Sequence, residues 1–448
     1  MTANRETPAA PNERELRLSR IGRALAFSFG VAVLVAGGVF GGLWVLLDVK
    51  EIGATAKLDA KTLFDLVKLS FGVVAGAGAL VALVVAYRRQ RLDEVGAHRE
   101  ATRLHTERFT QAVEQLGSDS PAIRLGGVHA LAGLADDAPD DNLRQTCVDV
   151  LCAYLQLPFT PDPGNDPTHQ EEHHRYLALR KVRHTILRLI GDHYRRPQGT
   201  HRSWQGCDLD LTGVTIDGNM DFSGAVFSGG RMDFSGAVFF GCTVGFGDAV
   251  FSGGTMDFSR AVFSGGSVGF SDAVFSGGSV GFSDAVFSGG TMDFSDAAFS
   301  GGTMDFSRAA FSGGSVGFGG AVFSGGSVGF GGAVFSGGRM GFIGATFSGD
   351  TVGFGGAVFS GGTVGFSGAV FSGGTVNFGN ATFSGGTVNF GNATFSGGTV
   401  NFGGATFSGG TVDFGSARGP VPMGLLAVVG TPVPSTVLLP FAWLPTLP

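Results

Sequence analysis

The sequence predicts a mixed fold, in which an N-terminal two-helix membrane anchor and a small all-α region precede a C-terminal β-helix. Three observations lead to this prediction. Two long apolar segments lie near the start of the chain, helical patterns follow them, and from Phe222 to Phe414 phenylalanine recurs at alternating gaps of five and seven residues. A period of this kind indicates a solenoid, because one repeat unit cannot bury its own apolar face and must stack on its neighbours.

The composition of the 448-residue chain reflects this repeat, with 78 glycines and 42 phenylalanines. The net charge of -7 argues against a nucleic-acid-binding protein, which would need a clustered basic surface. Cys147, Cys152, Cys207 and Cys242 have neither the spacing of a disulfide framework nor that of a zinc site. We expect them to be small buried residues in a reducing compartment.

The membrane anchor is predicted from two uncharged apolar segments, residues 24–47 and 69–87. A helix of about 20 residues crosses a hydrocarbon core of about 30 Å. Arginines precede the first segment and follow the second, which favours the cytoplasm for residues 1–23 and for the bulk of the chain. Residues 48–68 then form an extracytoplasmic loop, and the protein is a multi-pass protein of the inner or plasma membrane.

Residues 88–203 are predicted to be a cytoplasmic helical region with a linker near residues 158–170. Ser120 is suited to cap one helix, and Asp140 or Asp141 to cap the next. The residues expected to face inward are Ile123, Val128, Leu131 and Leu134 in the first of these helices, and Leu143, Val148, Leu151 and Leu155 in the second.

A histidine cluster precedes the last predicted helix. His169 and His173 are four residues apart, a spacing that can place two metal ligands on one helix face, and His174 follows directly. The order of glutamate and histidine does not match the zinc-protease signature, and no third ligand is evident. We therefore expect a solvated helix start here, with no metal and no cofactor.

The β-helix is predicted over residues 204–416. In an extended chain alternate side chains point to opposite sides. Phe227 and Ala225 therefore point inward together, while Val226 points outward. The Ser-Gly-Gly sequence that follows is suited to a corner, because glycine tolerates the positive φ that corners demand.

The repeat resembles the pentapeptide-repeat family. Cys207–Leu211, Ala225–Gly229 and Met232–Gly236 fit its frame of a small residue, a polar residue and then Leu or Phe every five residues. Alternate pentapeptides are separated by two extra residues, so the repeat has an atypical 12-residue form. Residues 107–117 and 124–131 also resemble the region that precedes such repeats in bacterial membrane-anchored members. The resemblance implies a right-handed quadrilateral β-helix.

One coil of the helix could contain one repeat unit, about 12 residues, or two units, about 24 residues. One unit leaves little interior for two phenylalanines, whereas two units provide four sides and four phenylalanines, the number of inward large residues that the resemblance implies. We favour two units, about 24 residues per coil, which gives about eight coils and stacked aromatic ladders in the core.

The outward positions carry whatever the solenoid recognises. A row of exposed valines can mark an interface, although valine is also common in strands because of its high β-propensity. The candidate interaction face consists of Val226, Val238, Val250, Val262, Val274, Val286, Val322, Val334, Val358 and Val370. Residues 417–448, an uncharged proline-rich tail, lose the period and could plug the open end of the solenoid.

These features favour a non-enzymatic, membrane-anchored scaffold or protein-interaction module that binds a protein partner or itself, with no small-molecule substrate and no nucleic acid. One alternative is a DNA mimic that protects a topoisomerase. Eleven aspartates against four arginines between residues 220 and 415 are sparse for that role. Another alternative is a purely structural, self-assembling rod.

Overall fold

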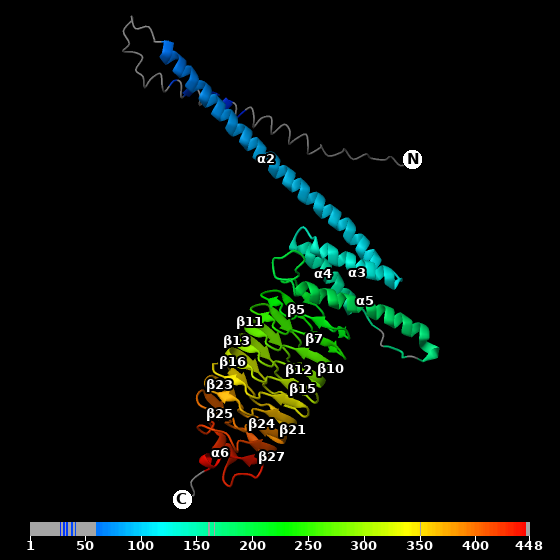
Figure 1. The fold of residues 1–448 in the computed structure, drawn as a ribbon, viewed down its shortest axis with the longest axis vertical. Helices are drawn as coiled ribbons and strands as arrows, with labels where there is room; N and C mark the ends of the chain where they lie inside the picture. Colours follow the sequence, from blue (N-terminus) through cyan, green and yellow to red (C-terminus); the bar gives the residue numbers. More distant parts are fainter. Residues whose placement is uncertain are drawn as a thin grey trace, which may run out of the picture. The chain divides into compact units, whose positions relative to one another are not determined.

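The computed structural model describes residues 60–444 apart from positions 160, 161, 165 and 350, together with eight residues between positions 27 and 41. The chain divides into two compact units, Met1–Thr102 and Arg103–Pro448. Figure 1 shows helices at the start of the second unit and a stack of strands after them.

Helix α2, Ala60–Leu116, forms most of what is described of the first unit and continues into the second. The predicted segments 1–23, 24–47 and 48–68 lie wholly or largely outside the described residues. Among the helices of the described part, none is long and apolar enough to cross a bilayer. Neither the predicted span 24–47 nor the predicted span 69–87 is therefore supported, and the membrane location stays a prediction.

The helical region of the second unit contains α3 (Pro121–Asp136), α4 (Asp141–Gln156), the short 3-10 helix η1 (Pro167–His169) and α5 (Gln170–Tyr194). Asp140 caps α4, because its carboxylate accepts a hydrogen bond from the backbone N–H of Leu143 at 2.9 Å.

The inward residues of these helices are buried as expected at Val128, Leu131 and Val148. Ile123 is an exception, since half of its surface is exposed. It lies in the first turn of α3, before Gly127, where a Cβ would lie 2.5 Å from the backbone of α2. Close packing of α3 on α2 thus occurs after Ile123.

The β-solenoid consists of two parallel 14-stranded sheets, which lie on the two sides of the stack in Figure 1. We call sheet A the one that contains β1 (Leu209–Asp210), β4 (Val226–Phe227), β5 (Arg231–Asp233), β8 (Val250–Phe251), β9 (Thr255–Asp257), β11 (Val274–Gly281), β13 (Ala298–Asp305), β16 (Val322–Gly329), β19 (Thr346–Phe347), β20 (Thr351–Gly353), β22 (Val370–Phe371), β23 (Thr375–Asn377), β25 (Thr394–Phe395) and β26 (Thr399–Asn401). Sheet B contains β2 (Thr215–Ile216), β3 (Met220–Asp221), β6 (Val238–Phe239), β7 (Thr243–Gly245), β10 (Val262–Gly269), β12 (Val286–Asp293), β14 (Ala310–Phe311), β15 (Ser315–Gly317), β17 (Val334–Phe335), β18 (Arg339–Gly341), β21 (Val358–Gly365), β24 (Thr382–Asn389), β27 (Thr406–Asp413) and β28 (Val437–Leu438).

The strand register fixes the length of one coil. Val262 pairs with Val286, and Val286 pairs with Ala310, so each residue lies beside the one 24 positions later. The solenoid has about ten turns rather than the eight predicted, because pairing begins at Leu209 and the tail adds a last strand, β28. The right-handed, quadrilateral form stays a prediction.

The core contains stacked phenylalanines. Phe258 and Phe282, one coil apart, have ring centroids 4.8 Å apart and planes within 3° of parallel, and both are fully buried. Ala225 and Met232 are buried beside such rings, as the alternation of the strand predicts. The aromatic ladders run the length of the solenoid, and they provide most of the apolar surface that holds successive coils together.

The Ser-Gly-Gly bend divides each sheet strand into two parts. Gly254 has a φ of +72°, a conformation that other residues adopt only with strain. A Cβ on Gly253 would lie 2.5 Å from the carbonyl oxygen of Ser228 in the preceding coil. One glycine is thus required for backbone conformation and the other for the close approach of neighbouring coils.

The helical region covers the first coil of the solenoid. The side-chain amide of Gln145 in α4 donates to the carbonyl of Asp208 at 2.8 Å and accepts from its N–H at 2.8 Å. Gln156 donates to the carbonyl of Asp210. Backbone groups at the first edge of sheet A, which would otherwise have no strand partner, are in this way paired by side chains.

The tail covers the last coil. Strand β28 pairs with β27, and Trp443 in the 3-10 helix η2 (Phe441–Trp443) lies with its ring centroid 5.7 Å from that of Phe395 and 5.8 Å from that of Phe414. Helix α6 (Leu425–Val429) buries two of its apolar side chains against the same end. The tail therefore occupies the place expected of a solenoid cap.

Candidate interaction surfaces

The ten candidate valines form two rows on opposite sheets. Successive members of the sequence row lie half a coil apart, so they fall on alternate sheets. Sheet A carries Val226, Val250, Val274, Val322 and Val370, whereas sheet B carries Val238, Val262, Val286, Val334 and Val358. Three of them, Val226, Val322 and Val334, are exposed, and the other seven are half-buried. The sequence row thus becomes two candidate surfaces.

The two surfaces differ in charge. The outward positions of sheet A include Arg231, Asp233, Asp257 and Asp305, and Arg231 pairs with Asp233 at 2.5 Å. Sheet B between Val238 and Thr411 has only Asp293 and Arg339 as charged residues on its described strands. It also carries Phe240, whose side chain is 63% exposed. Over the same residues the described strands of sheet A carry Asp257 and Asp305, so the two sheets have two charged residues each and differ in sign, since the arginine lies on sheet B.

The aspartates and asparagines that end many strands stabilise the turns that follow. Asp293 accepts hydrogen bonds from the backbone N–H of Ser295 at 3.0 Å and from the hydroxyl of Ser271, one coil earlier, at 3.0 Å. Burial raises the pKa of Asp293, but these hydrogen bonds lower it by more, so that the net pKa is lowered. Asn377 caps its turn in the same way, through the N–H of Gly379 at 2.8 Å. This outward row thus has a structural role.

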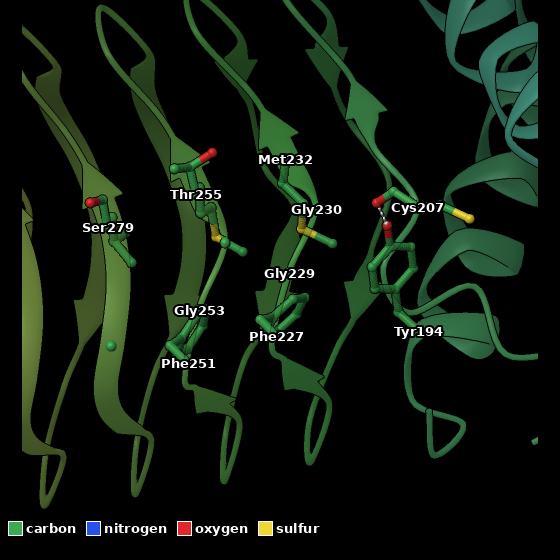
Figure 2. Close-up of a pocket in the computed structure, with 14 residues that line it drawn as sticks. Tyr194, Cys207, Phe227, Gly229, Gly230, Met232, Phe251, Gly253, Thr255 and Ser279 are labelled. Atoms are coloured by element: carbon green, nitrogen blue, oxygen red, sulfur yellow. Dashed lines mark hydrogen bonds between the residues drawn. The ribbon is translucent and has the colours of Figure 1, made fainter. Parts of the chain in front are cut away.

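Shallow indentations follow the Ser-Gly-Gly bends. Figure 2 shows the one at the first coils, lined by Phe227, Gly229, Gly230 and Gly253. It has a cavity volume of about 10 Å³, about the space that one water molecule occupies. The hydroxyl of Tyr194 donates to the carbonyl of Cys207 beside it at 2.6 Å. An indentation of this size is surface relief and not a small-molecule pocket.

The tight turns carry charged side chains in the left-handed conformation. Arg308 and Asp284, one coil apart at φ of +59° each, form a two-point ion pair with distances of 2.7 and 2.8 Å. The pair holds the pKa of Asp284 below its usual range. Asp248, Asp272 and Asp296 occupy the equivalent positions of the opposite turns. Asp and Asn adopt this conformation more readily than most residues.

The histidine cluster does not converge on a common point. Nδ1 of His173 lies 2.6 Å from a carboxylate oxygen of Asp162, and His169 lies beside the hydroxyl of Thr168. His173 and His174 have ring centroids 6.4 Å apart. Among the described residues, no group of three histidine, cysteine or acidic side chains is arranged to hold a metal ion.

The four cysteines are unpaired thiols. Cys147, Cys152 and Cys242 are buried, and Cys207 is half-buried. Burial raises the pKa of Cys147 to about 12 and that of Cys207 to about 11, so both are protonated at neutral pH. A protonated thiol is a poor nucleophile.

An ionic cluster on α5, not predicted from the sequence, joins the helices to the solenoid. Asp217 accepts from Arg180 at 2.8 Å and lies 3.3 Å from Nε2 of His184. Arg183, almost fully buried, donates to the carbonyls of Leu155 at 2.7 Å and Thr215 at 3.0 Å. The spacing of these basic residues is a signal for a shared helix face, but partners such as Asp217 and Leu155 are distant in the sequence and carry no such signal.

Comparison with known families matches residues 366–418 to the model described as pentapeptide repeats (9 copies). These residues are pentapeptide repeats. The resemblance predicted from the sequence is confirmed there, and the preceding coils share their 24-residue register. No curated protein and no solved structure matches the chain.

Proposed function

We propose that this chain is a non-enzymatic interaction module whose solenoid presents its outer sheet surfaces to other protein molecules. The observation that supports this most is the alignment of the outward rows. Side chains of one kind, such as Val262, Val286 and Val334, recur on the coils of a single sheet. Such a row is a long regular surface with few charges, which suits contact with another protein surface.

Two matched sets of substitutions test the proposal. One variant of the full chain replaces the five sheet B valines by threonine, and the other replaces the five sheet A valines. Threonine already occupies this position at Thr346, Thr382, Thr394 and Thr406, so we expect both variants to keep the β-solenoid in circular dichroism. Each is tagged and cross-linked beside the unmodified chain.

We expect one set to reduce recovery of a stoichiometric partner, or of a second copy, by at least tenfold while the other set does not. Equal recovery with both variants and with the unmodified chain would contradict the proposal. The matched sets separate a surface effect from a general loss of stability, because both make the same chemical change five times.

A DNA mimic is less well supported. A mimic needs a dense, uncompensated row of negative charge. The aspartates of the solenoid are sparse, Asp284 is neutralised by Arg308, and Asp233 by Arg231. Failure of the purified chain to alter supercoiling by a topoisomerase would remove this alternative.

A further inference from the structure

We propose that a buried ion pair, the protonated ring of His193 and the carboxylate of Asp136, joins the helical region to the first coil of the solenoid, and that this contact opens when the ring loses its proton above neutral pH. His193 is the next-to-last residue of α5, and Asp136 is the last residue of α3. Trp204, which precedes β1, packs on the pair. We call these three side chains the junction. This inference goes beyond the proposed function and does not depend on it.

The junction is buried and connects the ends of two helices to the entry of the solenoid. The ring of His193 stacks on that of Trp204, with centroids 4.1 Å apart and planes 21° from parallel. Nε1 of Trp204 donates to Oδ1 of Asp136 at 3.1 Å, and its backbone N–H donates to the carbonyl of His193 at 3.3 Å. His193 is 4% exposed, and Trp204 is fully buried. The polar groups of the junction therefore depend on one another for hydrogen bonds.

Both ring nitrogens of His193 face oxygen atoms. Nδ1 lies 2.6 Å from the carbonyl oxygen of Leu189, and Nε2 lies 3.2 and 3.3 Å from the two carboxylate oxygens of Asp136. A carbonyl oxygen can only accept, so Nδ1 carries a hydrogen. A neutral imidazole has one such hydrogen, which would leave the lone pair of Nε2 directed at the carboxylate. The arrangement therefore needs a second hydrogen between Nε2 and Asp136.

This second hydrogen belongs to His193 rather than to Asp136. The carboxylate of Asp136 already accepts from Nε1 of Trp204, and Nε of Arg202 lies 3.8 Å from its other oxygen. Both contacts favour the ionised carboxylate. On the other side of the ring, the face of the indole attracts a cation that stacks on it. The pair is thus an imidazolium beside a carboxylate.

The other charged groups around the junction are paired with each other at the surface. Asp137, which follows α3, lies 3.6 Å from Nε2 of His201, and both side chains are exposed. On α5, Asp192 is paired with Arg195 at 2.6 Å, and Arg195 lies 3.0 Å from Asp221 of the first coils. Ion pairs as exposed as these are screened by solvent and contribute little. The buried pair is therefore the main charge contact between these elements.

The buried pair makes the stability of the helical end depend on pH. An unfolded chain loses the proton of a histidine above about pH 6.5. The folded pair keeps it, so above that pH the folded state binds one proton more than the unfolded state. The stabilisation is complete below about pH 6.5, and above it the unfolding equilibrium constant rises about tenfold for each pH unit. Once the ring is neutral, Asp136 is a buried charge without a partner on α5, and the junction opens.

The charge on the ring tests the inference directly. Nitrogen-15 NMR of the full chain, labelled at its nine histidines, distinguishes a ring with two N–H groups from a neutral ring. The resonances of His193 are those lost in His193→Gln. We expect two N–H groups at about pH 7.5, one unit above the value at which an unfolded histidine loses its proton. A neutral His193 ring at that pH would overturn the inference.

A matched pair of isosteric variants tests the dependence on pH. In Asp136→Asn the amide oxygen can accept from Trp204, and the amide nitrogen can donate to Nε2 of a neutral ring, so the variant does not need the proton. We expect the melting temperature of the unmodified chain to exceed that of Asp136→Asn at about pH 6.5, and the difference to shrink by about pH 8.5. Asp137→Asn is the control, and its difference from the unmodified chain should stay the same. A difference for Asp136→Asn that is equal at both pH values would contradict the inference.

Hydrogen exchange in the unmodified chain tests where the effect lies. Between about pH 6.5 and 8.5, the opening equilibrium constant at the N–H of Trp204, corrected for the intrinsic exchange rate, should rise at least tenfold. The N–H of Phe402, which is bonded to the carbonyl of Met423 at the last coil, should keep its value, because the coils of a solenoid contact only their neighbours. An equal rise at both amides would place the titrating group elsewhere and overturn the inference.

Discussion

The two ends of the solenoid are covered in different ways, the first by polar side chains and the second by an apolar tail. Each end leaves an edge of unpaired backbone and an open aromatic ladder, which invite association with other edges. At the first coil, polar side chains of Gln145, Gln156 and Arg183 supply the missing hydrogen bonds. At the last coil, the tail supplies a strand and buries Trp443 on the ladder. The stability of the first end should therefore depend on pH and on its polar side chains. The stability of the second end should depend on the volume of the buried apolar side chains.

The largest effect is expected at the last coil. Trp443→Ala removes an indole that is 4% exposed, packs on two phenylalanines and donates from Nε1 to the carbonyl of Gly419 at 2.8 Å. We expect a loss of about 3–5 kcal/mol from the free energy of unfolding, because the cavity cannot collapse fully. Chemical denaturation of the full chain measures it, together with hydrogen exchange at residues 395–414. Phe441→Ala, in the same tail but 91% exposed, is the control and should change little.

Arg183→Met tests the polar end. The substitution keeps the length of the side chain but removes its hydrogen bonds to Leu155 and Thr215, leaving two carbonyls without a donor. We expect a loss of about 2–3 kcal/mol, and faster hydrogen exchange in the first coil than in the last. Arg188→Met is the control, since Arg188 is exposed and its guanidinium forms an ion pair with Asp192 on the same helix. Equal exchange changes at both ends would contradict the contrast between them.

The pH dependence should belong to the first end. Burial raises the pKa of Asp217, but hydrogen bonds from His184 and Arg180 lower it by more, so that the net pKa is lowered. A carboxylate of this kind stabilises the fold above its unfolded pKa of about 4, and the stabilisation is lost as the pH falls through the folded value. The melting temperature of the unmodified chain should therefore exceed that of Asp217→Asn at pH 7, and the two should converge below about pH 4. A gap that widens on acidification would show that Asp217 is not the group responsible.

The smallest effect is expected at Gln145. Gln145→Ala removes two neutral hydrogen bonds to Asp208 at an exposed edge, so we expect a loss of about 1 kcal/mol. Water can replace these bonds in part. The free energy of opening at the N–H of Asp208, measured by hydrogen exchange, should fall by more than the global free energy of unfolding. Thr146→Ala is the comparison, since the hydroxyl of the neighbouring Thr146 donates to the carbonyl of Asn142 in the same helix.

Much of the solenoid could be predicted from the sequence, because its structure repeats local rules. The inward phenylalanines, the glycine bends and the capping of α4 by Asp140 follow from residues that are neighbours in the chain. The length of the coil was predicted from the interior space that phenylalanine side chains need, because two repeat units enclose four rings and one unit leaves little room for two. The same coil length implies that the ten valines lie on two sheets, which was not inferred from their single sequence row.

The contacts at the two ends could not be predicted, because they join distant segments. Gln145 and Asp208 are 63 residues apart, and no local pattern marks a glutamine that will pair with an edge strand. The predicted burial of Ile123 was wrong because helical periodicity gives a face but not the point at which a neighbouring helix meets it. The family match, likewise, covers only residues 366–418.

The register of the coils constrains how this gene can change length. One repeat unit of the sequence is half a coil, and unequal exchange between near-identical units can add or remove a single one. The gain of one unit would move every later residue from one sheet to the other, carrying Ala310 and Arg339 to the side of Arg231. A gain of two units lengthens the solenoid without altering either surface. We therefore expect functional length variants of this protein to differ by even numbers of units.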